Sequence, residues 1–102
     1  MKKYKLIIHN RVFDQISEIQ NYIASLNTYK AAENYSNRLF EEIETITYLA
    51  DVMPFSRWKV AKKYHAKAKR LITKNRKWNI IFHTDGEFAI VDSILPSSII
   101  NE

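Results

Sequence analysis

The chain has 102 residues, of which 46% are hydrophobic and 26% are charged; this composition is typical of one globular domain and excludes a disordered segment. It contains no cysteine, which excludes disulfides and thiolate metal sites and suits the reducing cytoplasm. Its formal net charge is +5, and no apolar run is long enough to span a bilayer. We expect a single cytoplasmic domain over residues 1–102 that begins with a mature N-terminus, not a signal peptide, and has no membrane partner.

The first third of the chain predicts a strand followed by a helix. Lys3–His9 alternates loosely between apolar and polar residues, as a half-buried strand does. Asn10 is the predicted helix N-cap. After it, apolar residues recur at helical spacing and form one stripe: Val12, Ile16, Ile19, Ile23 and Leu26.

A second helix is predicted from Tyr29 to Ala50. Its apolar stripe includes Leu39, Ile43 and Ile46, while its glutamates lie off that stripe. The link between the two helices is short, so they should pack antiparallel as a helical hairpin. Met53-Pro54 ends the second helix, because a residue before proline resists the helical conformation.

The second half of the chain predicts a loop and three strands. We predict a loop with one helical turn over Phe55–Ala66. Asp85-Gly86 predicts a type I′ hairpin turn. The predicted strands, in order, are Lys67–Thr73, Trp78–Thr84 and Glu87–Leu95, with a turn at Lys74–Lys77 after the first.

The resulting fold class is α+β with the order β-α-α-β-β-β. The last three strands form an antiparallel meander, and the first strand joins this antiparallel sheet. The N-terminal helical hairpin covers one face of the sheet.

The positive charge is concentrated in one block. Residues Val52–Thr84 contain ten Lys or Arg and no Asp or Glu. A field of one sign favours a phosphate-rich or acidic partner, whereas the alternative is a solvated face that maintains solubility. The predicted target-binding or phosphate-binding residues are Arg57, Lys59, Lys62, Lys63, Lys67, Lys69, Arg70, Lys74, Arg76 and Lys77.

Aromatic and histidine side chains give weaker signals. Trp58 either anchors a partner or folds onto the core, and Tyr22 is a second interface candidate. The three histidines, His9, His65 and His83, lack the close spacing of a metal site, so we expect no metal and no cofactor. A histidine next to a hairpin turn, such as His83, is more often a tolerated surface residue than a functional one.

Most of the chain resembles the RelE/ParE family of bacterial type II toxins, also known as the plasmid stabilisation family. The resemblance lies in the opening strand "YKLIIH", the helices "VFDQISEIQNYIA" and "AAENYSNRLFEEIETITYL", the proline segment "MPFSRW", and the stretch "KRLITKNRKWNIIFHTDGEFAIVDSIL". It implies a RelE/ParE-like fold and a protein that inhibits growth when free. It also implies neutralisation by a cognate antitoxin, expected to carry an acidic C-terminal segment that fits a groove between the hairpin and the sheet edge.

The resemblance leaves two modes of attack open. RelE-type toxins cleave messenger RNA in the ribosome without a metal, and the matching candidates here are Arg70, Lys74 and His83. RelE-type nucleases also carry basic, His or Tyr groups after the last strand, but the segment "PSSIINE" here has none. ParE-type toxins poison DNA gyrase and need only a complementary surface. We therefore favour a ParE-like, non-catalytic toxin, with an mRNA endonuclease and a non-toxic nucleic-acid-binding or adaptor domain as alternatives.

Overall fold

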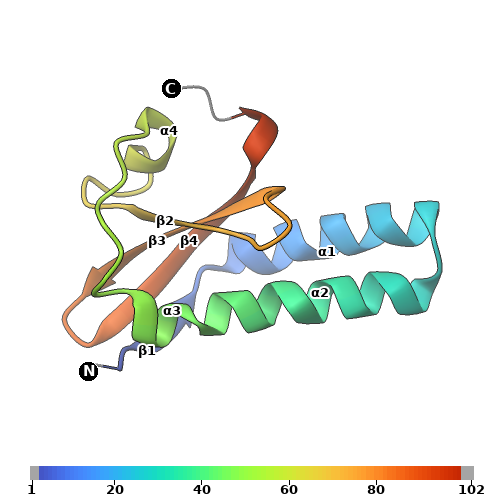
Figure 1. Cartoon of the computed structure of the whole chain (residues 1–102), viewed down its shortest axis with the longest axis horizontal. Helices are drawn as coiled ribbons and strands as arrows, with labels where there is room; N and C mark the ends of the chain where they lie inside the picture. The colour runs from blue at the N-terminus through green and yellow to red at the C-terminus, as the bar shows by residue number, and fades with distance from the viewer. Residues whose placement is uncertain (1–2, 100–102) are drawn as a thin grey trace.

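The computed structural model describes residues 3–99, which form four strands, four α-helices and a final 3-10 turn (Figure 1). The predicted order of one strand, two helices and three strands is confirmed, and the helical turn expected within the loop is present as α4. The elements are β1 (Lys5–Ile8), α1 (Asn10–Leu26), α2 (Tyr29–Glu44), α3 (Ile46–Leu49), α4 (Lys59–Lys62), β2 (Lys69–Ile72), β3 (Trp78–Asp85), β4 (Phe88–Pro96) and η1 (Ser97–Ile99).

The helical hairpin begins with two side-chain caps. The predicted cap at Asn10 is wrong by one residue: His9 is the N-cap of α1, and its Nδ1 accepts a hydrogen bond from the Arg11 backbone N–H at 3.1 Å. Thr28 caps α2 in the same way through the Ala31 N–H. These side chains satisfy backbone donors that the first helical turn leaves unpaired.

The second predicted helix is broken at Thr45 into α2 and α3. The Thr45 hydroxyl donates to the Glu42 carbonyl at 2.6 Å, and the Thr45 N–H bonds to the same carbonyl. Threonine side chains compete in this way for carbonyls that would otherwise continue the helical ladder. The two apolar stripes nevertheless stay in phase, since Ile43 and Ile46 are both fully buried.

The four strands form one sheet in the order β1-β4-β3-β2. Strands β2, β3 and β4 form the predicted antiparallel meander. β1 joins it parallel to β4, so the sheet is mixed and not entirely antiparallel. A parallel neighbour is possible here because the hairpin supplies the long crossover that parallel strands require.

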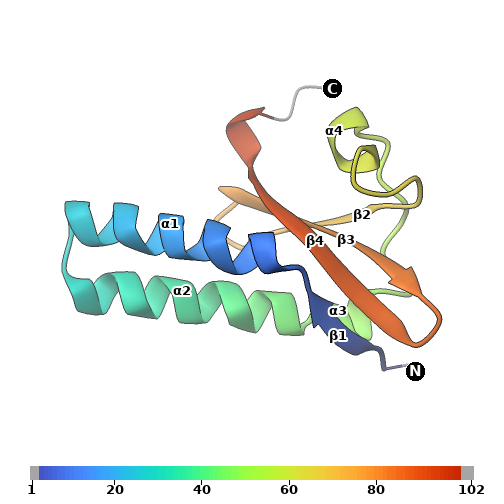
Figure 2. The ribbon, with the colours of Figure 1, turned by 180° about the vertical axis from the view of Figure 1, so that it is seen from behind.

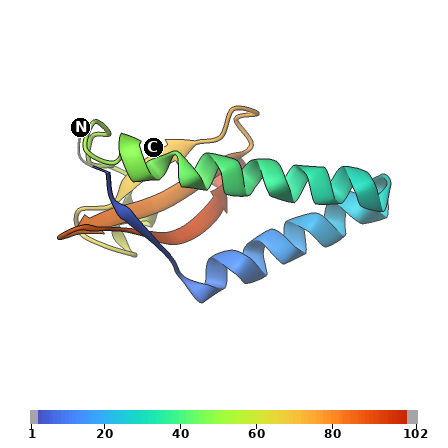
Figure 3. The same ribbon diagram turned by 90° about the horizontal axis from the view of Figure 1, so that it is seen from below.

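The two faces of the sheet are covered differently. The hairpin packs on one face through a large core, and α4 lies on the opposite face over a small cluster made of Trp58, Ala61, Ala68, Ile81 and Leu95 (Figures 1 and 2). The free end of the hairpin projects beyond the sheet (Figure 3).

The β3–β4 hairpin turn differs from the prediction. A type I′ turn needs positive φ at both central residues. Asp85 pairs with Phe88, so the central residues are Gly86 and Glu87, and of these only Gly86 has a positive φ, of 58°. Glycine at the first central position is the requirement of a type II′ turn instead.

Candidate functional site on the α4 face of the sheet

Strand β2 divides its two basic residues between the faces of the sheet. Successive side chains on a strand point to opposite sides. Lys69 points to the hairpin side, where it is 7% exposed and its Nζ donates to the Ala50 carbonyl at 2.5 Å. The prediction that Lys69 contacts phosphate is therefore wrong, because its charge caps the end of α3 in the interior. Arg70 points to the α4 side.

Arg70 stacks on Trp58 on the α4 face. The guanidinium carbon lies 3.3 Å from the centroid of the indole ring, the geometry of a cation–π contact. Trp58 is only 9% exposed and belongs to the small cluster under α4. Of the two interpretations of Trp58, the exposed partner anchor is wrong and folding onto the core is confirmed, and the buried ring carries the Arg70 guanidinium.

His83 and Asp92 form a hydrogen-bonded pair beside Arg70. His83 Nδ1 lies 2.7 Å from Asp92 Oδ2, and the two side chains are 12% and 11% exposed. His83 is thus not the tolerated surface residue that the sequence predicted. A carboxylate on one imidazole nitrogen orients the ring and leaves the other nitrogen to act as a base or an acid.

A β-bulge brings Asp92 to this position. Ile81 pairs with Ser93 and Phe82 pairs with Val91, which leaves Asp92 as the extra residue of β4. Bulges redirect side chains in this way and are common beside functional sites.

Gln15 of α1 secures the bulge through two hydrogen bonds. Its Nε2 donates to Ser93 Oγ and its Oε1 accepts from the Ile94 N–H, both at 2.8 Å. One amide therefore bonds to both residues that follow Asp92. The helical hairpin therefore fixes the shape of β4, the strand that carries Asp92.

His65, which follows α4, completes the group. Its ring stacks on the His83 ring with centroids 4.0 Å apart and planes 4° apart. Its Nδ1 accepts from the Lys67 backbone N–H at 3.0 Å. The sequence did not distinguish His65 from a surface histidine. We call His65, His83 and Asp92 the histidine cluster.

The structure separates the predicted basic residues into two exposed groups. One surrounds α4, and the other occupies the β2–β3 turn, where Arg76 adopts a positive φ of 63°. Among residues 3–99, no exposed basic side chain of either group forms an ion pair. The α4 group comprises Arg57, Lys59, Lys62, Lys63 and Lys67, and the turn group comprises Lys74, Arg76 and Lys77.

Lys74 does not share a site with His83. Lys69 pairs with Phe82, so the β2–β3 register places Ala68 opposite His83. Ala68 precedes Lys74 by six residues along the chain. At strand spacing this separation is about 20 Å. The predicted trio of Arg70, Lys74 and His83 therefore reduces to Arg70 and His83, which lie on the same face of the sheet.

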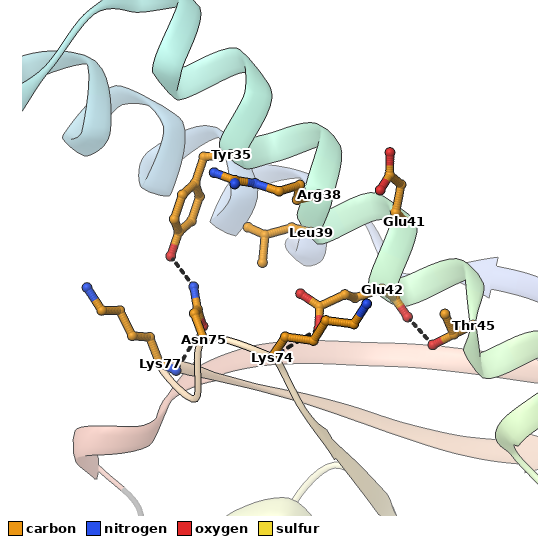
Figure 4. A pocket seen from close by; sticks show the side chains of 9 residues that line it. All are labelled: Tyr35, Arg38, Leu39, Glu41, Glu42, Thr45, Lys74, Asn75 and Lys77. Carbon is orange, nitrogen blue, oxygen red and sulfur yellow. Dashed lines mark hydrogen bonds between the residues drawn. The ribbon is translucent and has the colours of Figure 1, made fainter.

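The turn group borders a hollow of about 670 Å³ between the β2–β3 turn and α2 (Figure 4). Glu42 Oε1 accepts from the Lys74 N–H at 2.7 Å, and Tyr35 OH accepts from Asn75 Nδ2 at 2.9 Å. Glu41 also lines the hollow. Acidic side chains therefore offset part of the positive charge of the turn, whereas residues 52–67 around α4 contain no acid.

Tyr22, the other interface candidate, is 62% exposed near the projecting end of the hairpin, on a different part of the molecule. Within residues 3–99, no three acidic or histidine side chains gather closely enough to hold a metal ion. No helix in this range is long and apolar enough to cross a membrane. The segment "PSSIINE" has no Arg, Lys, His or Tyr, and its end, residues 100–102, lies outside the described residues.

Sequence reasoning missed Asp92, Gln15 and the role of His65. One signal was available for Asp92: it is the single acid within the apolar run "AIVDSIL" of a strand buried on both faces. A charge at such a position requires a partner. The bulge and the contact with Gln15, 78 residues away in sequence, leave no comparable local pattern.

Comparison with known proteins supports the fold. No protein-family model and no curated protein sequence matches this chain. Among solved structures, the chain is similar to a chain of the chromosomal ParDE TA (toxin–antitoxin) system from P. aeruginosa, with a TM-score of 0.78 and 12% sequence identity. The match covers 92% of this chain and 96% of the other. The predicted RelE/ParE-like fold is thereby confirmed.

Proposed function

We propose that this protein is the growth-inhibiting toxin of a type II toxin–antitoxin module. The observation that carries the proposal is the end-to-end similarity of its fold to a chain of a ParDE system. A cognate antitoxin with an acidic C-terminal segment is the expected partner, because the toxin exposes two groups of unpaired cations. Co-purification with the product of an adjacent reading frame tests this part of the proposal, and a toxin-alone phenotype that the adjacent product does not suppress would contradict it.

The proposed mode of action is ParE-like: non-catalytic binding to DNA gyrase or another protein target. The α4 group supports this mode because Lys59, Lys62 and Lys63 are exposed at helical spacing i, i+3 and i+4 on a segment without acids. Such a surface attracts acidic protein or the DNA that gyrase holds. The described part of the C-terminal segment adds no acid–base group to the sheet.

Two triple variants with the same change of charge test the α4 group. Lys59→Gln, Lys62→Gln and Lys63→Gln together should abolish growth inhibition and the inhibition of gyrase supercoiling. The matched control combines Lys74→Gln, Arg76→Gln and Lys77→Gln, and should retain most of both effects because the turn lies against the acids of α2. Equal loss in both variants would show that only net charge matters, and a toxic α4 variant would refute the role of α4.

The histidine cluster supports a second candidate function, cleavage of messenger RNA on the ribosome. His83, oriented by Asp92, and the neighbouring Arg70 are a possible base and phosphate clamp for attack by a 2′-hydroxyl. Primer extension on message from a translating extract decides between the candidates. Discrete ribosome-dependent cuts that His83→Ala removes would favour the nuclease, and intact message with a toxic His83→Ala variant would favour the protein target.

A non-toxic nucleic-acid-binding or adaptor domain is the remaining alternative. It predicts normal growth on induction and binding to nucleic acid that weakens steeply with salt.

A further inference from the structure

The stacked imidazoles of His65 and His83 join two parts of the molecule. His65 belongs to the segment that follows α4, and His83 belongs to β3 in the middle of the sheet. The other attachments of the α4 segment are the small cluster, to which Trp58, Val60 and Tyr64 contribute, and the contact of Arg11 with the Tyr64 ring. The stack is therefore one of a few contacts that hold α4 on the sheet.

The hydrogen bonds define where the protons of the two rings lie. A backbone N–H can only donate, so His65 Nδ1, which accepts from Lys67, carries no proton. Docked His65 is therefore neutral, with its proton on Nε2. His83 Nδ1 shares a proton with Asp92, so a proton added to this pair resides on a ring that already has a carboxylate partner.

The charges around the pair disfavour a second added proton. Asp92 is the acid of the histidine cluster, and its hydrogen bond is with His83 rather than His65. Positive side chains outnumber acids on the neighbouring elements. The charged groups there are Asp92 on β4, the exposed Asp85 on β3, Glu87 of the β3–β4 turn paired with Lys5 on β1, Arg70 on β2, Arg11 on α1 over the Tyr64 ring, and Lys62, Lys63 and Lys67 on the segment that carries His65.

We propose that the His65–His83 stack is a proton-sensitive latch that holds the α4 segment on the sheet and releases it in mild acid. Protonation of His65 removes the hydrogen bond from Lys67 and places a second cation 4.0 Å from the His83 ring. The released segment has neither penalty, so it binds a proton more readily than the docked segment does. Docking is therefore weakened as the pH falls.

This inference does not depend on the proposed function, although the latch controls the segment that carries Lys59, Lys62 and Lys63. Trp58 provides an internal reporter, because it is buried under α4 and becomes exposed if the segment lifts. The other tryptophan, Trp78, is replaced by phenylalanine to leave Trp58 as the single emitter. The Trp78→Phe protein serves as the parent for all comparisons.

The experiment follows Trp58 fluorescence and far-UV circular dichroism from about pH 7.5 to about pH 5. We expect a red shift of the emission as the pH falls and no loss of helical signal, since the hairpin stays folded. Addition of His65→Gln should abolish the transition, because glutamine can still accept from the Lys67 N–H but cannot take up a proton. His9→Asn, which removes a histidine outside the stack while keeping a capping side chain, should leave it unchanged.

Three results would overturn the latch. They are a constant emission across the range in the parent, a transition that persists in the His65→Gln variant, and a transition that coincides with loss of the helical signal. Hydrogen exchange provides a second measurement: amides of residues 58–67 should exchange faster at the lower pH, after correction for intrinsic rates, while those of α2 should not.

Discussion

The two faces of the sheet differ in how they are held together. On the hairpin face, thirteen buried residues from α1, α2, α3 and the sheet form one core, whereas the α4 face has a cluster of five. Exposed cations and the histidine cluster are concentrated on the second face. Segments with little buried apolar surface open at low free-energy cost. The hairpin face is therefore the scaffold of the molecule, whereas the α4 face combines a small core with a charged surface.

Substitutions that delete one buried side chain on each face test this difference, and the largest effect is expected on the hairpin face. Phe82 is fully buried in the large core. Phe82→Ala should lower the free energy of unfolding by about 3–5 kcal/mol, because it leaves a cavity that rigid helices cannot fill. Urea denaturation followed by far-UV circular dichroism measures this, and a loss below about 1 kcal/mol would show that the large core is not the scaffold.

On the α4 face, Trp58→Ala should have a more local effect. It removes the largest member of the small cluster and the ring on which Arg70 stacks. We expect faster hydrogen exchange in residues 58–67 and a smaller change in global unfolding than Phe82→Ala produces. Trp58→Phe is the control, since it keeps an aromatic ring in the cluster. Cooperative loss of α2 protection in the Trp58→Ala protein would mean that the two faces form one folding unit.

The scaffold was largely predictable from the sequence because its signals are local and repeated. The stripe of Val12, Ile16 and Ile19 recurs at helical spacing, and all three residues are buried. The predicted helix bounds were wrong where a single side chain ends a helix, as the hydroxyl of Thr45 does in the second helix. Nothing in the periodicity reports such a competition.

The α4 face was predictable in charge but not in geometry. The basic block indicated a charged surface, yet the alternation of β2 buries Lys69 and leaves Arg70 on the α4 side. The contact between His83 and Asp92 depends on a bulge, and the stack with His65 joins residues from separate elements. These are tertiary contacts, which the sequence around each residue does not encode on its own.

A partly buried polar contact on the hairpin side predicts a defined dependence of stability on pH. The Tyr4 hydroxyl donates to Asp51, and this hydrogen bond, with burial and the negative charge of Asp51, raises the pKa of Tyr4 above its ordinary value of 10.0. A raised pKa contributes stability that is fully present below the ordinary value of 10.0. The contribution is lost as the pH rises from there through the raised pKa of the folded protein, because the tyrosine of the unfolded chain ionises first. Tyr4→Phe should therefore reduce stability at neutral pH and flatten its decline above pH ~10.

Chemical denaturation of the parent and the Tyr4→Phe variant between about pH 8 and about pH 11 measures this difference, and the other tyrosines and the lysines cancel in the comparison. Parallel curves would show that the Tyr4–Asp51 hydrogen bond does not link proton binding to folding.

The smallest effect is expected from the ion pair between Lys5 of β1 and Glu87 of the β3–β4 turn. Its atoms are 3.5 Å apart, but the side chains are 69% and 60% exposed, so water and salt screen the attraction. A double-mutant cycle with Lys5→Ala and Glu87→Ala should give a coupling of at most about 0.5–1 kcal/mol that disappears at high salt. A larger coupling that survives salt would mean that charge, rather than the buried Tyr4 and the parallel hydrogen bonds to β4, fixes β1 at the edge of the sheet. The hairpin face would then depend on surface electrostatics as well as on its core, and the contrast between the two faces would be weaker.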